Sequence, residues 1–126
     1  MRRIHILTAL TALAAVAMLC AASASAQALH TWVSGVGNDA NPCSRTAPCL
    51  TFAGAFAKTA TYGEISCLDP GEFGPLTITQ SITIHCKAGA TGVEALGQNG
   101  IFINTTLPNI TVVLSGIKHQ WPCAIG

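Results

Sequence analysis

The chain has 126 residues, of which 50% are hydrophobic and only 9% are charged, and its formal net charge is +1 at pH 7. This near-neutral balance provides no basic patch to gather phosphates, so the composition argues against nucleic-acid binding. Once an export signal is removed, about a hundred residues remain, which make one small domain with proportionately little buried surface.

The first 26 residues have the pattern of an export signal. Arg2 and Arg3 supply a positive start, an apolar run follows from Leu7 to Ala22, and residues 24–26 (ASA) offer a small-residue cleavage site. A membrane anchor is the alternative, but the run is short for a bilayer core of about 30 Å and the cleavage pattern follows at once. The sequence therefore predicts an exported protein, periplasmic or extracellular, with no membrane attachment after signal removal.

The next predicted elements are a strand over Thr31–Ser34, a turn over residues 35–39 and a proline-containing loop. The period then changes to that of a helix over Thr51–Thr61, where apolar residues fall on one face. Thr51 is the expected N-cap of this helix and Gly63 its expected stop. We therefore expect one short helix ahead of a run of strands.

From Gly63 onward, short apolar alternations follow one another, each stopped by Pro, Gly or Asp. They predict strands at residues 65–67, 76–78, 82–86, 100–103 and 110–114, with a weaker one at 93–95. Short strands at intervals of roughly ten residues, without helices between them, indicate a sandwich, a barrel or a β-solenoid. A small disulfide-stapled sandwich would need antiparallel hairpins, for which Asn99-Gly100 is the single candidate turn.

All but one of the six cysteines lie beyond the signal, where an oxidising compartment lets disulfides persist. Sequence alone does not select their pairing. The interpretation favours Cys43 with Cys49, which bracket a loop, and Cys67 with Cys86, which lie on two strands whose apolar faces should point the same way. Cys123 is then unpaired, either as a reactive thiol or as the partner of a cysteine further along the chain.

Candidate ligands for a metal are few. Zinc sites usually pair cysteines two to four residues apart, and this chain has no such pair. His85 should face outward if its neighbours Ile84 and Cys86 face inward. Asp69 and Glu72 are the only close acidic pair and are the candidates for calcium binding or acid catalysis, although Asp before Pro-Gly is also a good turn former, which is the favoured interpretation. No metal, cofactor or catalytic residue is therefore predicted.

Several stretches together resemble the N-terminal segment of secreted right-handed parallel β-helix proteins of the pectin-lyase-like fold: residues 32–34 (WVS), 37–42 (GNDANP), 47–48 (AP), 51–52 (TF) and Ala55. Residues 32–86 resemble, more narrowly, a bacterial subset of repeat-containing β-helix proteins of unassigned activity. The resemblance implies an all-β fold in which a short helix caps the first coil of a parallel β-helix. Stacked coils bury a common core, and their end units need such caps.

Together with the export signal, this resemblance divides the chain into four predicted regions: a signal peptide (1–26), a first strand with disulfide loop and capping helix (27–62), incomplete β-helix coils (63–117) and an irregular tail (118–126). Only about two coils fit between Gly63 and Ile117, and no second cap is recognisable. The chain is therefore interpreted as an N-terminal fragment. Its exposed C-terminal coil edge is expected to favour self-association.

Two classes of function follow from the sequence. The first is an exported β-helix module without a catalytic site, which is structural or binds carbohydrate or a cell-surface partner. The second is the N-terminal part of a polysaccharide lyase or glycoside hydrolase whose active site lies beyond residue 126. The resemblance implies that lyases and hydrolases of this fold carry their acidic and basic catalytic residues on the long face of the solenoid. The sequence shows no such cluster of acidic and basic residues.

Overall fold

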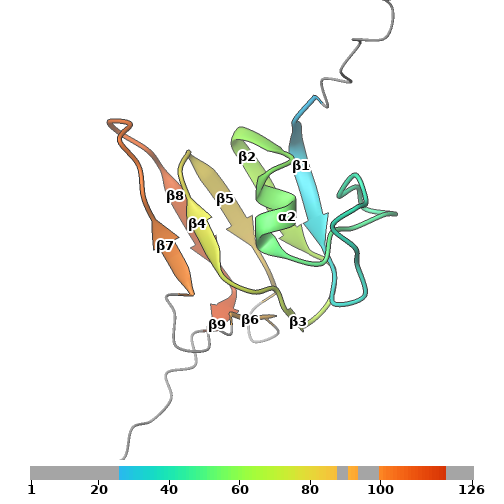
Figure 1. Ribbon diagram of the computed structural model, residues 1–126. Coiled ribbons are helices and arrows are strands. Elements are labelled where there is room, and N and C mark those ends of the chain that lie inside the picture. The colour runs from blue at the N-terminus through green and yellow to red at the C-terminus, as the bar shows by residue number, and fades with distance from the viewer. Residues whose placement is uncertain (1–25, 88–90, 94–99, 119–126) are drawn as a thin grey trace, which may run out of the picture.

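The computed structural model describes residues 26–87, 91–93 and 100–118 (Figure 1). The predicted signal, apart from Ala26, lies outside these residues, as do Cys123 and the tail from residue 119 onward. The described residues form one short helix and nine strands: β1 (Ala28–Val33), α2 (Phe52–Phe56), β2 (Thr59–Cys67), β3 (Gly71–Glu72), β4 (Leu76–Ile78), β5 (Ile82–His85), β6 (Thr91–Gly92), β7 (Ile101–Ile103), β8 (Val112–Ser115) and β9 (Ile117–Lys118). None of these elements is a helix long and apolar enough to cross a bilayer.

The strands form three sheets with the orders β1-β2-β5-β8, β3-β6-β9 and β4-β7. Every strand pair in these sheets is parallel. From β2 onward the chain contributes one strand to each of the three sheets in turn, and we call each such round of the chain a passage. Each strand pairs with the strand that the previous passage contributed to the same sheet. The fold is thus rich in strands with little helix. The parallel pairing contradicts the antiparallel sandwich that the strand pattern had left open.

Apolar side chains from successive strands fall into rows. Ile65 in β2 pairs with Ile84 in β5, which pairs with Leu114 in β8. Burial alternates along β5, where Ile84 is buried and His85 exposed, as the apolar alternation predicted. Residues that occupy equivalent positions in successive strands of one sheet therefore stack on one another. Such stacking lets short strands bury a common core. The fully buried large side chains are Val33, Phe52, Ile65, Phe73, Ile78, Ile82 and Ile84.

Helix α2 begins where the sequence predicted. Thr51 is its N-cap, with extended backbone and a hydroxyl oxygen that accepts a hydrogen bond from the Gly54 N–H at 2.9 Å. Such a cap satisfies one of the backbone donors that a helix leaves unpaired at its start. The buried face of the helix carries Phe52 and Ala55.

The end of this helix was predicted wrongly. It stops at Phe56, and the chain is already extended at Thr59, so Gly63 lies within β2 and not at a helix end. Thr59 is buried; its hydroxyl donates to the Ala55 carbonyl and accepts from the Thr31 hydroxyl of β1, both at 2.7 Å. Pairing of a β-branched residue with the neighbouring strand thus outweighs the local helical pattern.

Other boundaries shift by a few residues. The first strand begins at Ala28, earlier than Thr31, because Ala28 already pairs with Thr59. The weak strand expected near residue 93 lies at Thr91–Gly92. Lys118, which was assigned to the irregular tail, belongs to β9.

The two ends of the stack differ (Figure 1). At one end, α2 packs against β1, β2 and β4. Phe52 of this helix meets Phe73 with ring centroids 5.1 Å apart, and both rings are fully buried. At the other end lie β7, β8 and β9, each the last described strand of its sheet.

Candidate functional site

The four cysteines favoured for pairing form two disulfides, Cys43–Cys49 and Cys67–Cys86, with Cα–Cα distances of 4.7 and 4.8 Å. These are the same two pairs that the sequence favoured. Disulfides persist in oxidising compartments outside the cytosol, which agrees with an exported protein. The state of Cys123 stays a prediction, because that residue lies outside the described part of the chain.

The Cys43–Cys49 loop covers the edge of β1 that faces away from β2. The Trp32 N–H donates to the Cys43 carbonyl at 2.8 Å, and the Cys49 N–H donates to the Trp32 carbonyl at 2.9 Å. The Ser34 N–H in turn donates to the Cys49 carbonyl at 2.9 Å. These bonds occupy backbone groups that an open edge would offer to another chain.

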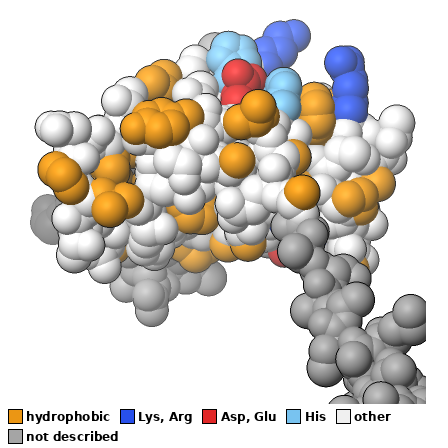
Figure 2. Space-filling view, turned by 90° about the horizontal axis from the view of Figure 1, so that it is seen from above, with side chains coloured by type: hydrophobic (Ala, Val, Ile, Leu, Met, Phe, Trp, Pro, Cys, Tyr) orange, Lys and Arg blue, Asp and Glu red, His pale blue; other side chains and the backbone are white. Residues whose placement is uncertain are grey.

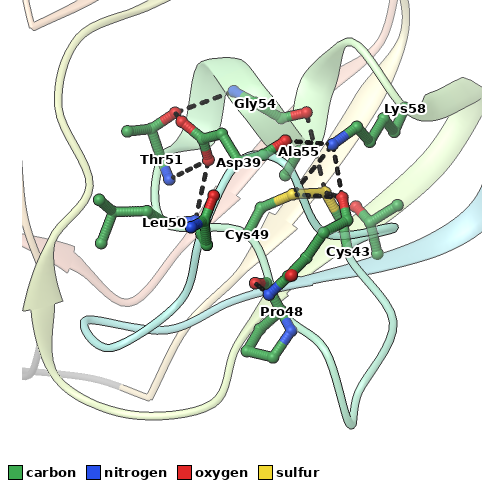
Figure 3. The surroundings of a disulfide bond; sticks show 12 residues. Asp39, Cys43, Pro48, Cys49, Leu50, Thr51, Gly54, Ala55 and Lys58 are labelled. Carbon is green, nitrogen blue, oxygen red and sulfur yellow. Dashed lines mark hydrogen bonds between the residues drawn. A yellow bond between two sulfur atoms is a disulfide. The ribbon is translucent and has the colours of Figure 1, made fainter.

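Two charged side chains hold this loop against the helix (Figure 3). The Lys58 ammonium donates to the carbonyls of Asp39 and Asn41, both at 2.5 Å. The Asp39 carboxylate accepts from the backbone N–H groups of Leu50 and Thr51, both at 2.9 Å, and from the Thr51 hydroxyl at 2.8 Å. The loop and the start of α2 are therefore tied together by charge-assisted hydrogen bonds.

These contacts change the acidity of Asp39. Partial burial raises the pKa of its carboxyl, but the hydrogen bonds from Thr51 and Leu50 and the nearby Lys58 charge outweigh that effect. The pKa of Asp39 consequently lies below its ordinary value of 3.8. The ionised form is the one that the fold stabilises.

Replacing Asp39 with asparagine should lower the free energy of unfolding at pH 7 by about 1 kcal/mol, a modest value because the carboxylate is solvent-exposed. A carboxyl with a lowered folded-state pKa contributes fully above its unfolded pKa and loses that contribution as the pH falls through the folded value. The difference between Asp39→Asn and wild type should therefore shrink below pH 3.8. Urea unfolding at pH 7 and in acid measures it; an equal difference at both pH values would contradict the assignment.

The predicted acidic pair is engaged by the chain itself. Asp69 accepts from the Ser34 hydroxyl at 2.5 Å and from the Gly35 N–H at 2.7 Å, one bond to each carboxylate oxygen. It thereby joins the turn after β1 to the turn after β2. Glu72 lies in β3. Among the described residues, no three His, Cys, Asp or Glu side chains are grouped to hold a metal. These contacts support the turn-forming role of Asp69.

A polar and aromatic cluster lies on the outer face of the four-stranded sheet. Its members alternate along two adjacent strands, at His30 and Trp32 in β1 and at Glu64 and Ser66 in β2. The parallel register pairs His30 with Glu64 and Trp32 with Ser66. We call these four residues the outer-face cluster.

The side chains of this cluster contact one another directly. The rings of His30 and Trp32 are stacked, with centroids 4.0 Å apart and an interplanar angle of 19°. His30 Nε2 lies 2.8 Å from Ser66 Oγ and 3.5 Å from Glu64 Oε1. The Ser66 hydroxyl donates to Glu64 Oε1 at 2.8 Å. The His30 and Glu64 side chains remain 43% and 40% exposed, so solvent reaches the cluster.

Serine, histidine and glutamate also form catalytic triads, but the connections here differ. In a triad the histidine accepts the serine proton and the acid binds the opposite ring nitrogen. Here Ser66 donates to Glu64, and both Ser66 and Glu64 lie beside the same nitrogen of His30, Nε2. The acid therefore does not orient His30 from the opposite ring nitrogen, as it does in a triad. The arrangement suits binding through an aromatic surface and fixed polar groups.

The cluster continues onto the next strand. Glu64 pairs with Thr83 of β5, and Ser66 pairs with His85, whose side chain is exposed. Figure 2 shows histidine side chains gathered beside an acidic one at the margin of the face in view, with Lys or Arg side chains nearby. The outer face thus offers polar groups on three adjacent strands.

Sequence reasoning missed this cluster. The sequence places Trp32 in the predicted first strand, but that strand is expected to begin at Thr31, after His30, and neither Glu64 nor Ser66 is assigned a role. The available signal was the shared alternation at positions 30 and 32 and at 64 and 66. Only the register between β1 and β2 brings those positions together.

Comparisons with known proteins add no relative to this picture. No protein-family model, curated protein or solved structure matched the chain.

Proposed function

We propose that the chain forms the first coils of a parallel β-helix, as its resemblance to pectin-lyase-like proteins implies. The chain contributes strands to three parallel sheets in a repeating order, which supports this architecture. So do the rows of apolar residues, since Ile65, Ile84 and Leu114 occupy equivalent positions in successive passages. Helix α2 then has the place of an end cap, because it covers the first passage of the chain.

We further propose that this exported module binds a neutral oligosaccharide on the outer face of its four-stranded sheet, without catalysis by the chain. The observation that carries the proposal is the outer-face cluster. An aromatic ring presents an apolar surface on which the C–H face of a sugar can pack. Glu64, Ser66 and His30 beside it offer hydrogen-bonding groups for sugar hydroxyls.

The negative charge of the outer-face cluster favours neutral sugars over acidic ones. The Glu64 carboxylate is the acidic group of the cluster and would repel a uronate or a sulfated sugar at short range. The site is formed by the face of a sheet and buries little of a ligand, so we expect weak binding, with Kd on the order of 0.1–1 mM. Parallel strands hold the groups in fixed positions, which limits the ordering cost of binding.

Replacing Trp32 with alanine should weaken this binding by at least about tenfold, since it removes the aromatic surface. Isothermal titration or NMR titration with neutral oligosaccharides, compared with uronate oligosaccharides of equal length, measures the effect. Tyr62→Ala is the matched control, because Tyr62 is an aromatic side chain of β2 that is 75% exposed and is not one of the four residues of the outer-face cluster.

Circular dichroism before each titration establishes that both variants are folded. Glu64→Gln provides a second test with a smaller change of shape, and it should raise the affinity for uronate sugars relative to neutral ones. Binding that is absent for all neutral oligosaccharides, or that Trp32→Ala leaves unchanged, would refute the proposed site.

A further inference from the structure

The last described passage of the chain leaves its inward-facing side chains open. Leu114 in β8 occupies the same row as Ile84, and Ile103 in β7 the same row as Ile78. Ile84 and Ile78 are 0% exposed, whereas Leu114 is 43% and Ile103 is 50% exposed. Leu114 and Ile103 are thus exposed to solvent, although the residues in equivalent positions of the previous passage are buried. A further layer of chain is what buries such residues elsewhere in the fold.

In the described part of the chain, backbone groups at the same end also lack a partner strand. The carbonyls of Thr111 and Ser115 accept from the N–H groups of Ile82 and Cys86, so they face β5. Groups of alternate residues point to opposite sides of a strand, and those of Val112 and Leu114 therefore face away from β5. Within the described residues, β8 has no other neighbouring strand. This edge, together with Leu114 and Ile103, is here called the open end.

The first end of the molecule cannot receive the open end of another copy. There α2 covers the first passage, and the Cys43–Cys49 loop occupies the edge of β1 with backbone hydrogen bonds. Head-to-tail stacking into a filament would require both ends to be free. The matching uncovered surface on a second copy is its own open end.

The absence of charged residues from the segment that forms the open end favours pairing between two copies of the chain. The segment from Gly100 to Ile117 contains no Asp, Glu, Lys, Arg or His. Two copies can therefore approach through it without repulsion, whereas a charged partner would find no counter-charge on this segment. Hydrophobic side chains also gather at the left of Figure 2, the side on which Figure 1 places β7 and β8.

We infer that a second copy of this chain docks on the open end, with the two β8 strands antiparallel about a two-fold axis. The contact buries Leu114 and Ile103 of both copies and pairs the free backbone of β8. Because both copies use the same surface, the assembly closes at a dimer. The inference is independent of sugar binding, which uses the outer face of the sheet.

The test is sedimentation equilibrium of the oxidised protein, purified from the compartment to which it is exported, over about 1–200 μM. We expect a concentration-dependent monomer–dimer equilibrium. Leu114→Glu should raise the dimer Kd at least about a hundredfold, because it places two like charges in an apolar contact. Leu114 is already 43% exposed, so the charge is tolerated in the monomer.

Val36→Glu is the matched control. Val36 is 91% exposed in the turn after β1, the strand at the opposite end of the sheet from β8, so its dimer Kd should change less than about threefold. A protein that stays monomeric at every concentration overturns the inference. This holds whether residues 119–126 or another protein would then cover the open end. Filaments, or equal effects of the two variants, would overturn it as well.

Discussion

Replacing Phe52 with alanine should lower the free energy of unfolding by about 3–5 kcal/mol. Phe52 is fully buried in α2 and packs against Phe73, which is also fully buried. Its removal leaves a cavity between the helix and the first passage of the chain, and fixed strands can collapse into that cavity only in part. A domain of this size has a total stability of roughly 5–15 kcal/mol, so this loss should remove a large fraction of the total.

Phe56→Ala is the control for this prediction. It removes the same ring from the same helix, but Phe56 is only partly buried against the core. Its effect should be about half as large or less, because less apolar surface is withdrawn from water. Urea unfolding followed by circular dichroism compares the two. Equal losses of stability would contradict the proposed role of α2 as an end cap anchored by Phe52.

Removing the Cys67–Cys86 disulfide is expected to cost about 3 kcal/mol in the chain-entropy model, because its closed loop is long. The two cysteines are 19 residues apart, and Cys86 is 2% exposed. The double variant Cys67→Ala/Cys86→Ala avoids a free thiol that could exchange with Cys43–Cys49. Its melting temperature should fall on the order of 10–20 °C relative to the oxidised wild type.

The double variant Cys43→Ala/Cys49→Ala is the comparison. That pair is only 6 residues apart, so the same model gives about 2 kcal/mol. Its loop also covers the edge of β1, and we expect the variant to aggregate more readily than its stability alone would suggest. An unchanged melting temperature for Cys67→Ala/Cys86→Ala under oxidising conditions would refute the importance of the longer bridge.

Strand positions could be predicted because each strand carries its own signal. In β5, Ile82 and Ile84 alternate with Thr83 and His85, and their burial in the structure follows the same alternation. Thr51 could be predicted as an N-cap for a similar reason, since capping depends on a hydroxyl only three residues from its donor. Local patterns thus supplied most of the elements.

Features that depend on contacts between distant residues could not be predicted in this way. The helix end at Phe56 is determined by the bond between Thr59 and Thr31, which are 28 residues apart. The outer-face cluster depends on the register that sets His30 beside Glu64. A register shift of one residue would turn either strand's side chains to the other face, and no local pattern reports that register.

Nuclear Overhauser contacts between backbone protons can establish whether successive passages of the chain stack in parallel, as the proposed β-helix requires. Ile84 should contact both Ile65 and Leu114, with the staggered pattern of parallel neighbours on each side. Close contacts between Hα protons of directly opposed residues are the pattern of antiparallel strands, and finding them would rule out the β-helix.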